Sequence, residues 1–422
     1  MPWARDAHAR VPITAARSTL PRETETTRVE TEARRDMARE CFPRGDEGKP
    51  GRASSGAPFP GKLFPVPDVA PADLLTSLLR DVSRSFYLTL SVLPRGVRRP
   101  IGLAYLLARA TDTIADTDLV PVPERLEALD ALRARILGKG TLPLDFASLA
   151  SAQCPTATAA ERTLLLRVEE AVSVLRVLDP ADLALVREVL STIAAGQELD
   201  LLRFGTVTPG VVRSLANGAE LDDYTYRVAG CVGEFWTRIC RVRLFPRARL
   251  DEARLLADGV RFGKGLQLVN ILRDIPRDLR GGRCYLPADG LAALGLAPGD
   301  LLDPANEPRV KPLYDAWLRV AEEHLAAGWR YTTTLPRGQV RVRLACAWPV
   351  LLGILTLEKL KRGRVLDPSA RIKVGRPEVR AMLWATVWRL PLGPAWNRLD
   401  DWARKIARPR EAAPANGATV GP

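Results

Sequence analysis

The chain has 422 residues, 46% hydrophobic and 26% charged, so it is long enough to bury a large core and is not disordered as a whole. Two histidines and six scattered cysteines without a CxxC pair exclude a histidine-built zinc centre, a zinc ribbon and a secreted disulfide scaffold; we expect reduced thiols in the cytoplasm. The net charge is +13, and the excess is concentrated in residues 359–410, which carry fourteen basic and four acidic side chains.

Residues 1–64 mix charged residues with Thr, Pro and Gly and show no sustained period, and residues 45–62 have the composition of turns and linkers. Acidic residues throughout this stretch argue against a transit peptide, and it contains no apolar segment typical of a signal peptide. We therefore expect residues 1–64 to be a disordered extension. A short disordered tail is also expected over residues 409–422.

From about residue 65 apolar residues recur with a spacing near 3.6, for example over residues 124–138, 161–178 and 181–202. Runs of alternating β-branched residues are nearly absent. The sequence therefore predicts one all-α domain over residues 65–380. The longest apolar run, residues 344–357, has 14 residues against the ~20 that a bilayer requires, so we expect a buried core helix and no transmembrane span.

Four polar side chains interrupt the apolar segment 102–118 in steps of four, three and four residues: Tyr105, Arg109, Asp112 and Asp116. At these steps they share one face of a helix. Two carboxylates one turn apart destabilise an isolated helix by roughly a few tenths of a kcal/mol, so a divalent cation is the natural counter-charge. Because their neighbours are apolar, we expect the four side chains to line a cavity.

A second polar stripe follows in residues 262–287, where Gln267, Asn270, Asp274 and Asp278 are spaced by three, four and four residues among apolar neighbours. Mg²⁺ prefers oxygen ligands, with a few carboxylates completed by substrate phosphates. Two such acidic helices facing each other are therefore predicted to hold Mg²⁺.

Basic side chains accompany both stripes and suit the oxygens of a diphosphate. They are Arg109, Arg273, Arg280 and Arg283. A single aspartate pair on a helix is usually a solvated face with surface salt bridges. Two pairs, each on a polar stripe within apolar sequence and each beside an arginine, favour the metal and diphosphate interpretation over the solvated face.

Four motifs then point to a known family: SRSFYLTL (83–90), AYLLARATDTIAD (104–116), YTYRVAGCVG (224–233), and LQLVNILRDIPRD with GGRCYLP (266–287). In this order and spacing they resemble the squalene/phytoene synthase family, over about residues 74–377. The resemblance implies a single all-α isoprenoid synthase domain whose helices surround a central cavity. It also implies prenyl diphosphate substrates, joined head to head through a cyclopropylcarbinyl diphosphate, with roughly two or three Mg²⁺ ions bound.

The resemblance implies roles for individual residues. The positions similar to metal ligands are Asp112, Asp116, Asn270, Asp274 and Asp278. The positions similar to substrate contacts are Ser83, Arg84, Ser85, Phe86, Arg109, Gln267, Arg273 and Arg283.

The resemblance also assigns catalytic tyrosines and a nucleotide site. Tyr224 aligns with a tyrosine implicated in proton removal, and Tyr105 with a tyrosine of the cavity. Arg371 and Lys373 resemble the basic pair that squalene synthases use to bind NADPH, although a solvated basic loop explains this pair equally well.

Three positions depart from the family pattern. Ala115 stands where squalene synthases often have a further acid, and Arg277 replaces an acid beside the second pair. Pro276, which lies between Asp274 and Asp278, removes one helical hydrogen bond and is predicted to kink that helix. Both aspartate pairs are nevertheless intact.

Residues 381–408 are predicted to form a basic helical segment that contains Trp384, Trp388, Trp396 and Trp402. One interpretation is a terminal helix packed on the domain with solvated arginines. Another is a helix at an anionic lipid surface, which predicts a cytoplasmic protein peripheral on the inner face of the membrane. Nucleic-acid binding is the least favoured interpretation, and no nucleic-acid partner is expected.

The resemblance is greatest to squalene synthases, which condense two farnesyl diphosphates to presqualene diphosphate and reduce it with NADPH to squalene. A phytoene or dehydrosqualene synthase without the hydride step is the alternative within this chemistry. A non-catalytic, membrane-associated assembly factor of the same fold is an alternative of another class, although such a protein is expected to lose acidic ligands. A terpene cyclase that uses one diphosphate accounts less well for residues 83–86 and 224–230.

Overall fold

The computed structural model describes residues 73–83, 86–117, 119–151, 158–205, 210–370 and 372–407. The predicted extension over residues 1–64 and the predicted tail over residues 409–422 lie outside the described residues, as do Arg84, Ser85 and Arg371. The described residues are almost entirely helical, with two strands of two residues each. The prediction of an all-α fold is confirmed.

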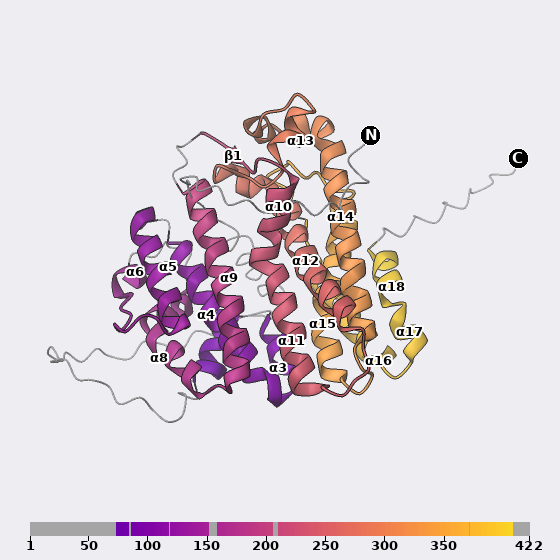
Figure 1. Cartoon of the computed structure of the whole chain (residues 1–422). Helices are drawn as coiled ribbons and strands as arrows, with labels where there is room; N and C mark the ends of the chain where they lie inside the picture. Colours follow the sequence, from indigo (N-terminus) through magenta and orange to yellow (C-terminus); the bar gives the residue numbers. More distant parts are fainter. Residues whose placement is uncertain are drawn as a thin grey trace, which may run out of the picture.

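Figure 1 labels most of the elements. The α-helices are α2 (Leu79–Ser83), α3 (Phe86–Val92), α4 (Arg95–Ala115), α5 (Val122–Leu137), α6 (Ala147–Ser151), α7 (Ala159–Leu166), α8 (Val168–Ser173), α9 (Pro180–Phe204), α10 (Gly218–Thr225), α11 (Cys231–Leu244), α12 (Glu252–Arg280), α13 (Ala288–Ala292), α14 (Glu307–Thr334), α15 (Val340–Leu360), α16 (Arg376–Arg389), α17 (Gly393–Asn397) and α18 (Leu399–Ile406). The π-helical turns are η1 (Leu74–Leu78) and η3 (Tyr226–Gly230); the 3₁₀ turns are η2 (Val174–Val177), η4 (Pro298–Leu302) and η5 (Pro304–Asn306). The strands are β1 (Arg213–Ser214) and β2 (Arg283–Cys284).

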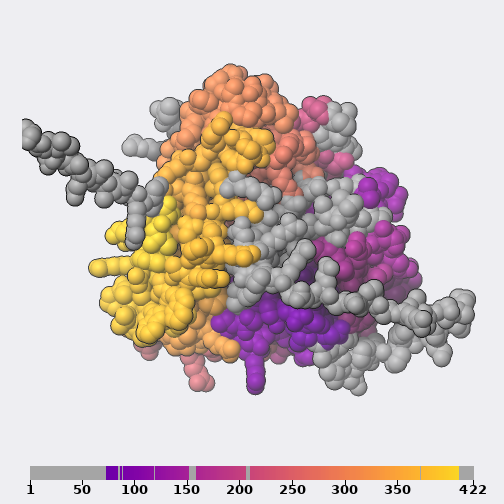
Figure 2. Space-filling model, turned by 180° about the vertical axis from the view of Figure 1, so that it is seen from behind, coloured from indigo at the N-terminus to yellow at the C-terminus, as the bar shows by residue number. Residues whose placement is uncertain are grey.

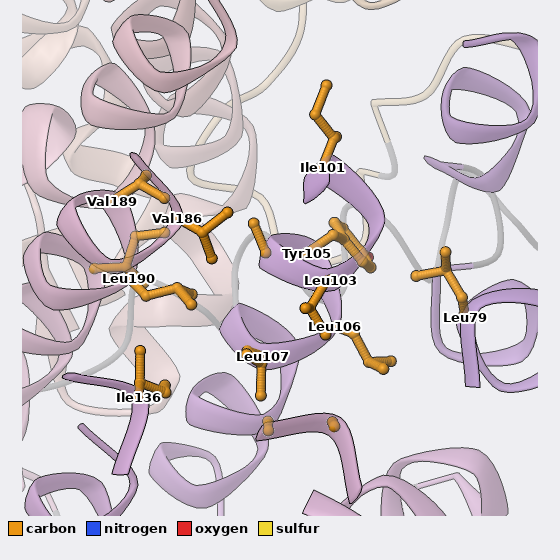
Figure 3. Packing of buried hydrophobic residues seen from close by; sticks show 14 of the residues in the cluster. Leu79, Ile101, Leu103, Tyr105, Leu106, Leu107, Ile136, Val186, Val189 and Leu190 are labelled. Carbon is orange, nitrogen blue, oxygen red and sulfur yellow. The ribbon is translucent and has the colours of Figure 1, made fainter. Parts of the chain in front are cut away.

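Helix α4 is buried on nearly all sides in the N-terminal half of the core. Leu103, Leu106 and Leu107 of α4 are completely buried, and Figure 3 shows them beside side chains of α2, α5 and α9. Burying each leucine contributes about 1.5–3 kcal/mol. The polar stripe of α4 therefore lies inside a tightly held helix.

The C-terminal half of the core is built around α12, α14 and α15 (Figure 1). By length and composition α15 alone, within the part of the chain that the structure describes, is long and apolar enough to cross a membrane. Its apolar window is 78% buried inside the protein. The prediction of a buried core helix over residues 344–357 is confirmed.

Two glycines bring α12 into backbone contact with α11 and η3. A Cβ atom on Gly233 would lie 1.9 Å from the carbonyl oxygen of Gly259, and one on Gly263 would lie 2.0 Å from the carbonyl oxygen of Ala229. No side chain fits at either position. This crossing fixes α12 one turn before the stripe that begins at Gln267.

Helix α12 continues through Pro276 to Arg280, so the proline does not end it. The Gly281–Gly282 loop that follows is held by a parallel pairing of β1 with β2. Gly282 has a φ of +78°, which favours glycine, and its carbonyl accepts a hydrogen bond of 2.9 Å from the backbone N–H of Arg213. These backbone hydrogen bonds fix the position of the chain directly after the second acidic stripe.

The C-terminal helices α16, α17 and α18 pack on the second half of the core. Trp396 is completely buried, and Trp348 Nε1 donates a hydrogen bond of 3.1 Å to Thr386 Oγ1 of α16. The predicted boundary between residues 380 and 381 falls inside α16. The basic segment therefore shares the core of the domain before it.

Candidate functional site

Asp112 is held from two helices. Arg109 Nη1 donates a hydrogen bond of 3.1 Å to Asp112 Oδ2, and Gln197 Nε2 of α9 donates one of 2.8 Å to Oδ1. All three side chains are buried. Because both oxygens have protein donors, the orientation of this carboxylate is set by the fold.

Arg109 lies between two carboxylates. Its second partner is Glu161, at the start of α7, whose Oε2 also accepts a hydrogen bond of 2.7 Å from the backbone N–H of Thr158 and so caps that helix. Burial alone would lower the pKa of Arg109, but the charges of Glu161 and Asp112, with a smaller effect of Asp116, raise it above its ordinary value. Arg109 is therefore charged at every pH at which the protein is folded.

Aromatic rings lie beside this end of α4. Phe86 of α3 stacks on Tyr105 with ring centroids 5.0 Å apart and an interplanar angle of 19°. Ser83 is completely buried at the end of α2, where its hydroxyl donates to the carbonyl of Leu79. Asp116 directly follows the last residue of α4 and is half-buried. The structure thus brings Phe86, Tyr105 and the polar stripe of α4 together.

A second group of side chains surrounds Tyr285, which follows β2. The ring of Tyr224 packs against it with centroids 4.9 Å apart, and both rings are buried. Burial raises the pKa of Tyr285 well above its ordinary value, Asp200 and Asp278 add to this rise, and Arg283 and the Tyr224 hydroxyl oppose it. Tyr224 and Asp278, which are 54 residues apart, therefore belong to one buried polar group.

Helix α9 links the two groups. Gln197 of α9 donates a hydrogen bond to Asp112 of α4. Asp200, three residues later on α9, raises the pKa of Tyr285, and so does Asp278 of α12. Residues three apart lie on the same face of a helix. One turn of α9 therefore connects the two acidic segments predicted from the sequence.

The stripe of α12 is partly engaged within the protein. Arg273 contacts Asp274 through two hydrogen bonds of 2.8 and 2.6 Å, and Asn270 is half-buried. Gln267 is 1% exposed, and neither its amide nitrogen nor its amide oxygen has a partner among the described residues. A buried amide without partners costs about 1–3 kcal/mol per group, which calls for a functional explanation.

The basic residues differ in their surroundings. Arg283 of β2 is half-buried, and burial lowers its pKa to about 10, so its charge would be stabilised by an anionic ligand. Arg280 is exposed and donates to the carbonyl of Pro276 (2.9 Å). Lys373 is half-buried, and its carbonyl accepts a hydrogen bond of 2.7 Å from Lys359 Nζ.

No three His, Cys, Asp or Glu side chains lie close enough together, in the part of the chain described, to hold a metal ion by themselves. Mg²⁺ usually takes one or two carboxylates and completes its shell with water and substrate phosphates. Carboxylates in pairs, and the unpartnered buried amide of Gln267 on the same stripe as Asp274, fit that mode of binding.

Sequence reasoning missed four residues of these groups: Glu161, Gln197, Asp200 and Tyr285. Two of them left a signal in the sequence. Gln197 and Asp200 are polar residues three apart on one helix, a spacing that also occurs in the two predicted stripes. Glu161 follows Thr158 at the spacing of a capping box, which predicts a helix start and nothing about a distant arginine.

The chain is similar to known proteins in sequence and in fold. The family profile for squalene/phytoene synthase matches residues 79–378. A presqualene diphosphate synthase of Zymomonas mobilis subsp. mobilis is 29% identical over 310 residues, which is 73% of this chain and 89% of that protein. A 15-cis-phytoene synthase of Enterobacter agglomerans is 38% identical over 133 residues, 31% of this chain and 40% of that protein.

The chain spans only part of several curated relatives, for example 32% of the bifunctional lycopene cyclase/phytoene synthase of Blakeslea trispora. Among solved structures, TcSQS with the ligand E5700 superposes with a TM-score of 0.62 at 20% identity, covering 80% of this chain and 99% of that one. At that identity the likeness concerns the fold.

Proposed function

Because the chain belongs to the squalene/phytoene synthase family, we propose that it is a prenyltransferase that joins two farnesyl diphosphates head to head to presqualene diphosphate. The observation that carries the substrate assignment is that presqualene diphosphate synthases align over about nine-tenths of their own length, 89% and 91% in two cases. The match to the phytoene synthase covers only 40% of that protein's length.

The buried carboxylates support this proposal. Asp112 is fixed by Arg109 and Gln197, and Asp278 lies buried beside Tyr285. Fixed charges in a site shielded from water act more strongly than in solution and need no reorganisation during the reaction. Burying a carboxylate costs free energy unless it is paired, and the fold supplies the partners that keep Asp112 in place.

The two stripes offer the oxygen donors that a magnesium ion takes. The residues that would hold it are Asp112, Asp116, Asn270, Asp274 and Asp278. When bound, Mg²⁺ would neutralise the leaving diphosphate and so favour ionisation of the allylic C–O bond. We propose that Arg273 and Arg283 bind the diphosphate oxygens, because Arg273 contacts Asp274 of the second stripe and Arg283, like Asp278 of that stripe, acts on Tyr285.

Aromatic and aliphatic side chains would protect and stabilise the carbocation. The stacked Phe86 and Tyr105 lie at one acidic segment, and Tyr224 with Tyr285 at the other. Aromatic faces attract cations, and buried apolar residues such as Leu268 and Ile271 of α12 keep water away from a reactive intermediate. We propose that the Tyr224 hydroxyl takes part in the proton removal that closes the cyclopropane ring.

The proposal is tested by incubating the full chain with Mg²⁺ and either farnesyl or geranylgeranyl diphosphate, each with and without NADPH, and identifying the lipid by mass spectrometry. We expect presqualene diphosphate from farnesyl diphosphate. Phytoene from geranylgeranyl diphosphate would support the alternative substrate, and no condensed product under any condition would support a non-catalytic relative.

The same assay tests whether this protein also reduces presqualene diphosphate with NADPH. The resemblance at Arg371 and Lys373 predicts that NADPH converts the product to squalene. Squalene that forms only when NADPH is present would support that step. Presqualene diphosphate that accumulates unchanged with NADPH would assign the reduction to another protein.

A further inference from the structure

The outer face of α16 carries a rigid aromatic patch. Trp384 and Trp388 are one turn apart and stack with ring centroids 6.3 Å apart, and they are 64% and 69% exposed. Val387 and Leu392 extend the same surface at 53% and 58% exposed. Trp384 and Trp388 are the only exposed tryptophans among the described residues.

The inner face of the same segment is anchored, so the patch does not arise from a loose helix. Trp396 packs against Trp329 with centroids 6.0 Å apart, and the Trp329 indole donates to the carbonyl of Asn397 (3.0 Å). The guanidinium of Arg389 lies 5.1 Å from the ring centre of Trp402, which joins α16 to α18. The basic segment contains four tryptophans, and the fold places them differently. Trp384 and Trp388 are exposed, Trp396 is buried and Trp402 is half-buried.

The exposed charged residues of 376–392 are all basic. They are Arg380, one turn before Trp384, and Arg376, two turns before it, on the same face of the helix. Residues 359–410 carry a net charge of +10. In Figures 1 and 2 the C-terminal helices, drawn in yellow, gather along one side of the molecule.

We propose that the outer face of α16 binds an anionic lipid surface, with Trp384 and Trp388 inserted at the headgroup level and Arg376 and Arg380 facing lipid phosphates. Tryptophan prefers the interface between hydrocarbon and water, and each nearby arginine is attracted to anionic lipid. An exposed apolar patch rimmed by basic residues matches such a surface better than a second copy of this chain, whose patch would carry the same positive charge. This inference does not depend on the chemistry of the active site.

The test is sedimentation of the full chain with vesicles of phosphatidylcholine alone or of phosphatidylcholine with phosphatidylglycerol. We expect binding to the anionic vesicles that weakens with added salt, and W384A/W388A to lower the partition coefficient by about tenfold or more. R376E/R380E is expected to lower it by about tenfold or more on anionic vesicles only. Prenyl diphosphate turnover in detergent should not change in either variant.

Two matched controls place the effect on α16. L142A/L166A removes exposed leucines near the ends of α5 and α7, and R247E/R249E reverses two exposed arginines before α12; neither is expected to alter vesicle binding. Circular dichroism checks that every variant is folded. Equal loss in the controls, no binding of the wild type, or a dimer that W384A/W388A converts to a monomer without changing vesicle binding would each overturn the proposal.

Discussion

Glu161 and Arg109 form an ion pair between positions 52 residues apart, and their side chains are only 4% and 3% exposed. The pair joins the N-terminus of α7 to the middle of α4, where Arg109 also contacts Asp112. Two carboxylates around one guanidinium leave the group with a negative charge. That charge is stable in the core because each group keeps hydrogen-bond partners.

We expect E161Q to lower the free energy of unfolding by about 3 kcal/mol, because it leaves Arg109 buried with one carboxylate in place of two. Urea unfolding at neutral pH measures the change. E198Q is the matched control, since Glu198 pairs with Arg133 at 2.9 Å while 24% exposed and should lose no more than about 1 kcal/mol. Similar losses in the two variants would contradict a structural role for the buried pair.

We expect D112N to lower turnover of farnesyl diphosphate by about 100-fold or more, since it removes a preorganised charge from the site. The chain should still fold, because Arg109 retains Glu161 and an asparagine oxygen can still accept from Gln197. Steady-state kinetics and circular dichroism check both statements. D130N, at an exposed position of α5, is the control and should be as active as the wild type.

The sequence predicted the helices and the positions of both polar stripes because these depend on local spacing. Asp112, Gln267 and Asp278 are buried on helices at the expected positions. The role of α9 was not predictable, because a single sequence does not say which helices pack together. Gln197 and Asp200 are visible in the sequence as polar residues three apart, but their spacing does not predict that Gln197 contacts Asp112.

The C-terminal tryptophans show the same limit. Their spacing indicates a helical segment but does not distinguish the face that meets α15 from the face that meets solvent. Only packing separates Trp396, which is completely buried, from Trp388, which is 69% exposed.

We expect G263A to destabilise the protein by about 3 kcal/mol or more, because its Cβ would lie 2.0 Å from a backbone oxygen that cannot move without shifting a helix. G338A is the matched control, since a Cβ there meets no atom within 4 Å. Thermal unfolding compares the two variants. Because the clash would displace α12, the fraction of G263A that still folds should also turn over substrate more slowly. A G263A variant as stable and as active as the wild type would contradict the close crossing of the helices.

His324 of α14 should make stability depend on pH in a defined window. Its Nδ1 accepts a hydrogen bond of 3.1 Å from Arg261 Nε, so the folded state requires the neutral ring. Burial, with the positive charges of Arg261 and Lys264, lowers the pKa of His324 from 6.5 to about 4, against a smaller opposing effect of Asp222.

The unfolded chain therefore binds a proton at His324 that the folded protein does not, and the difference exists between pH 6.5 and about pH 4. Stability due to this residue is complete above pH 6.5 and falls as the pH is lowered through that window, by roughly 3 kcal/mol. In H324N an amide oxygen can accept from Arg261 without titrating. Urea unfolding across this range should thus show a shallower loss for H324N than for the wild type. Carboxylates titrate in both proteins, so parallel curves would mean that His324 is protonated as readily in the folded state as in the unfolded chain.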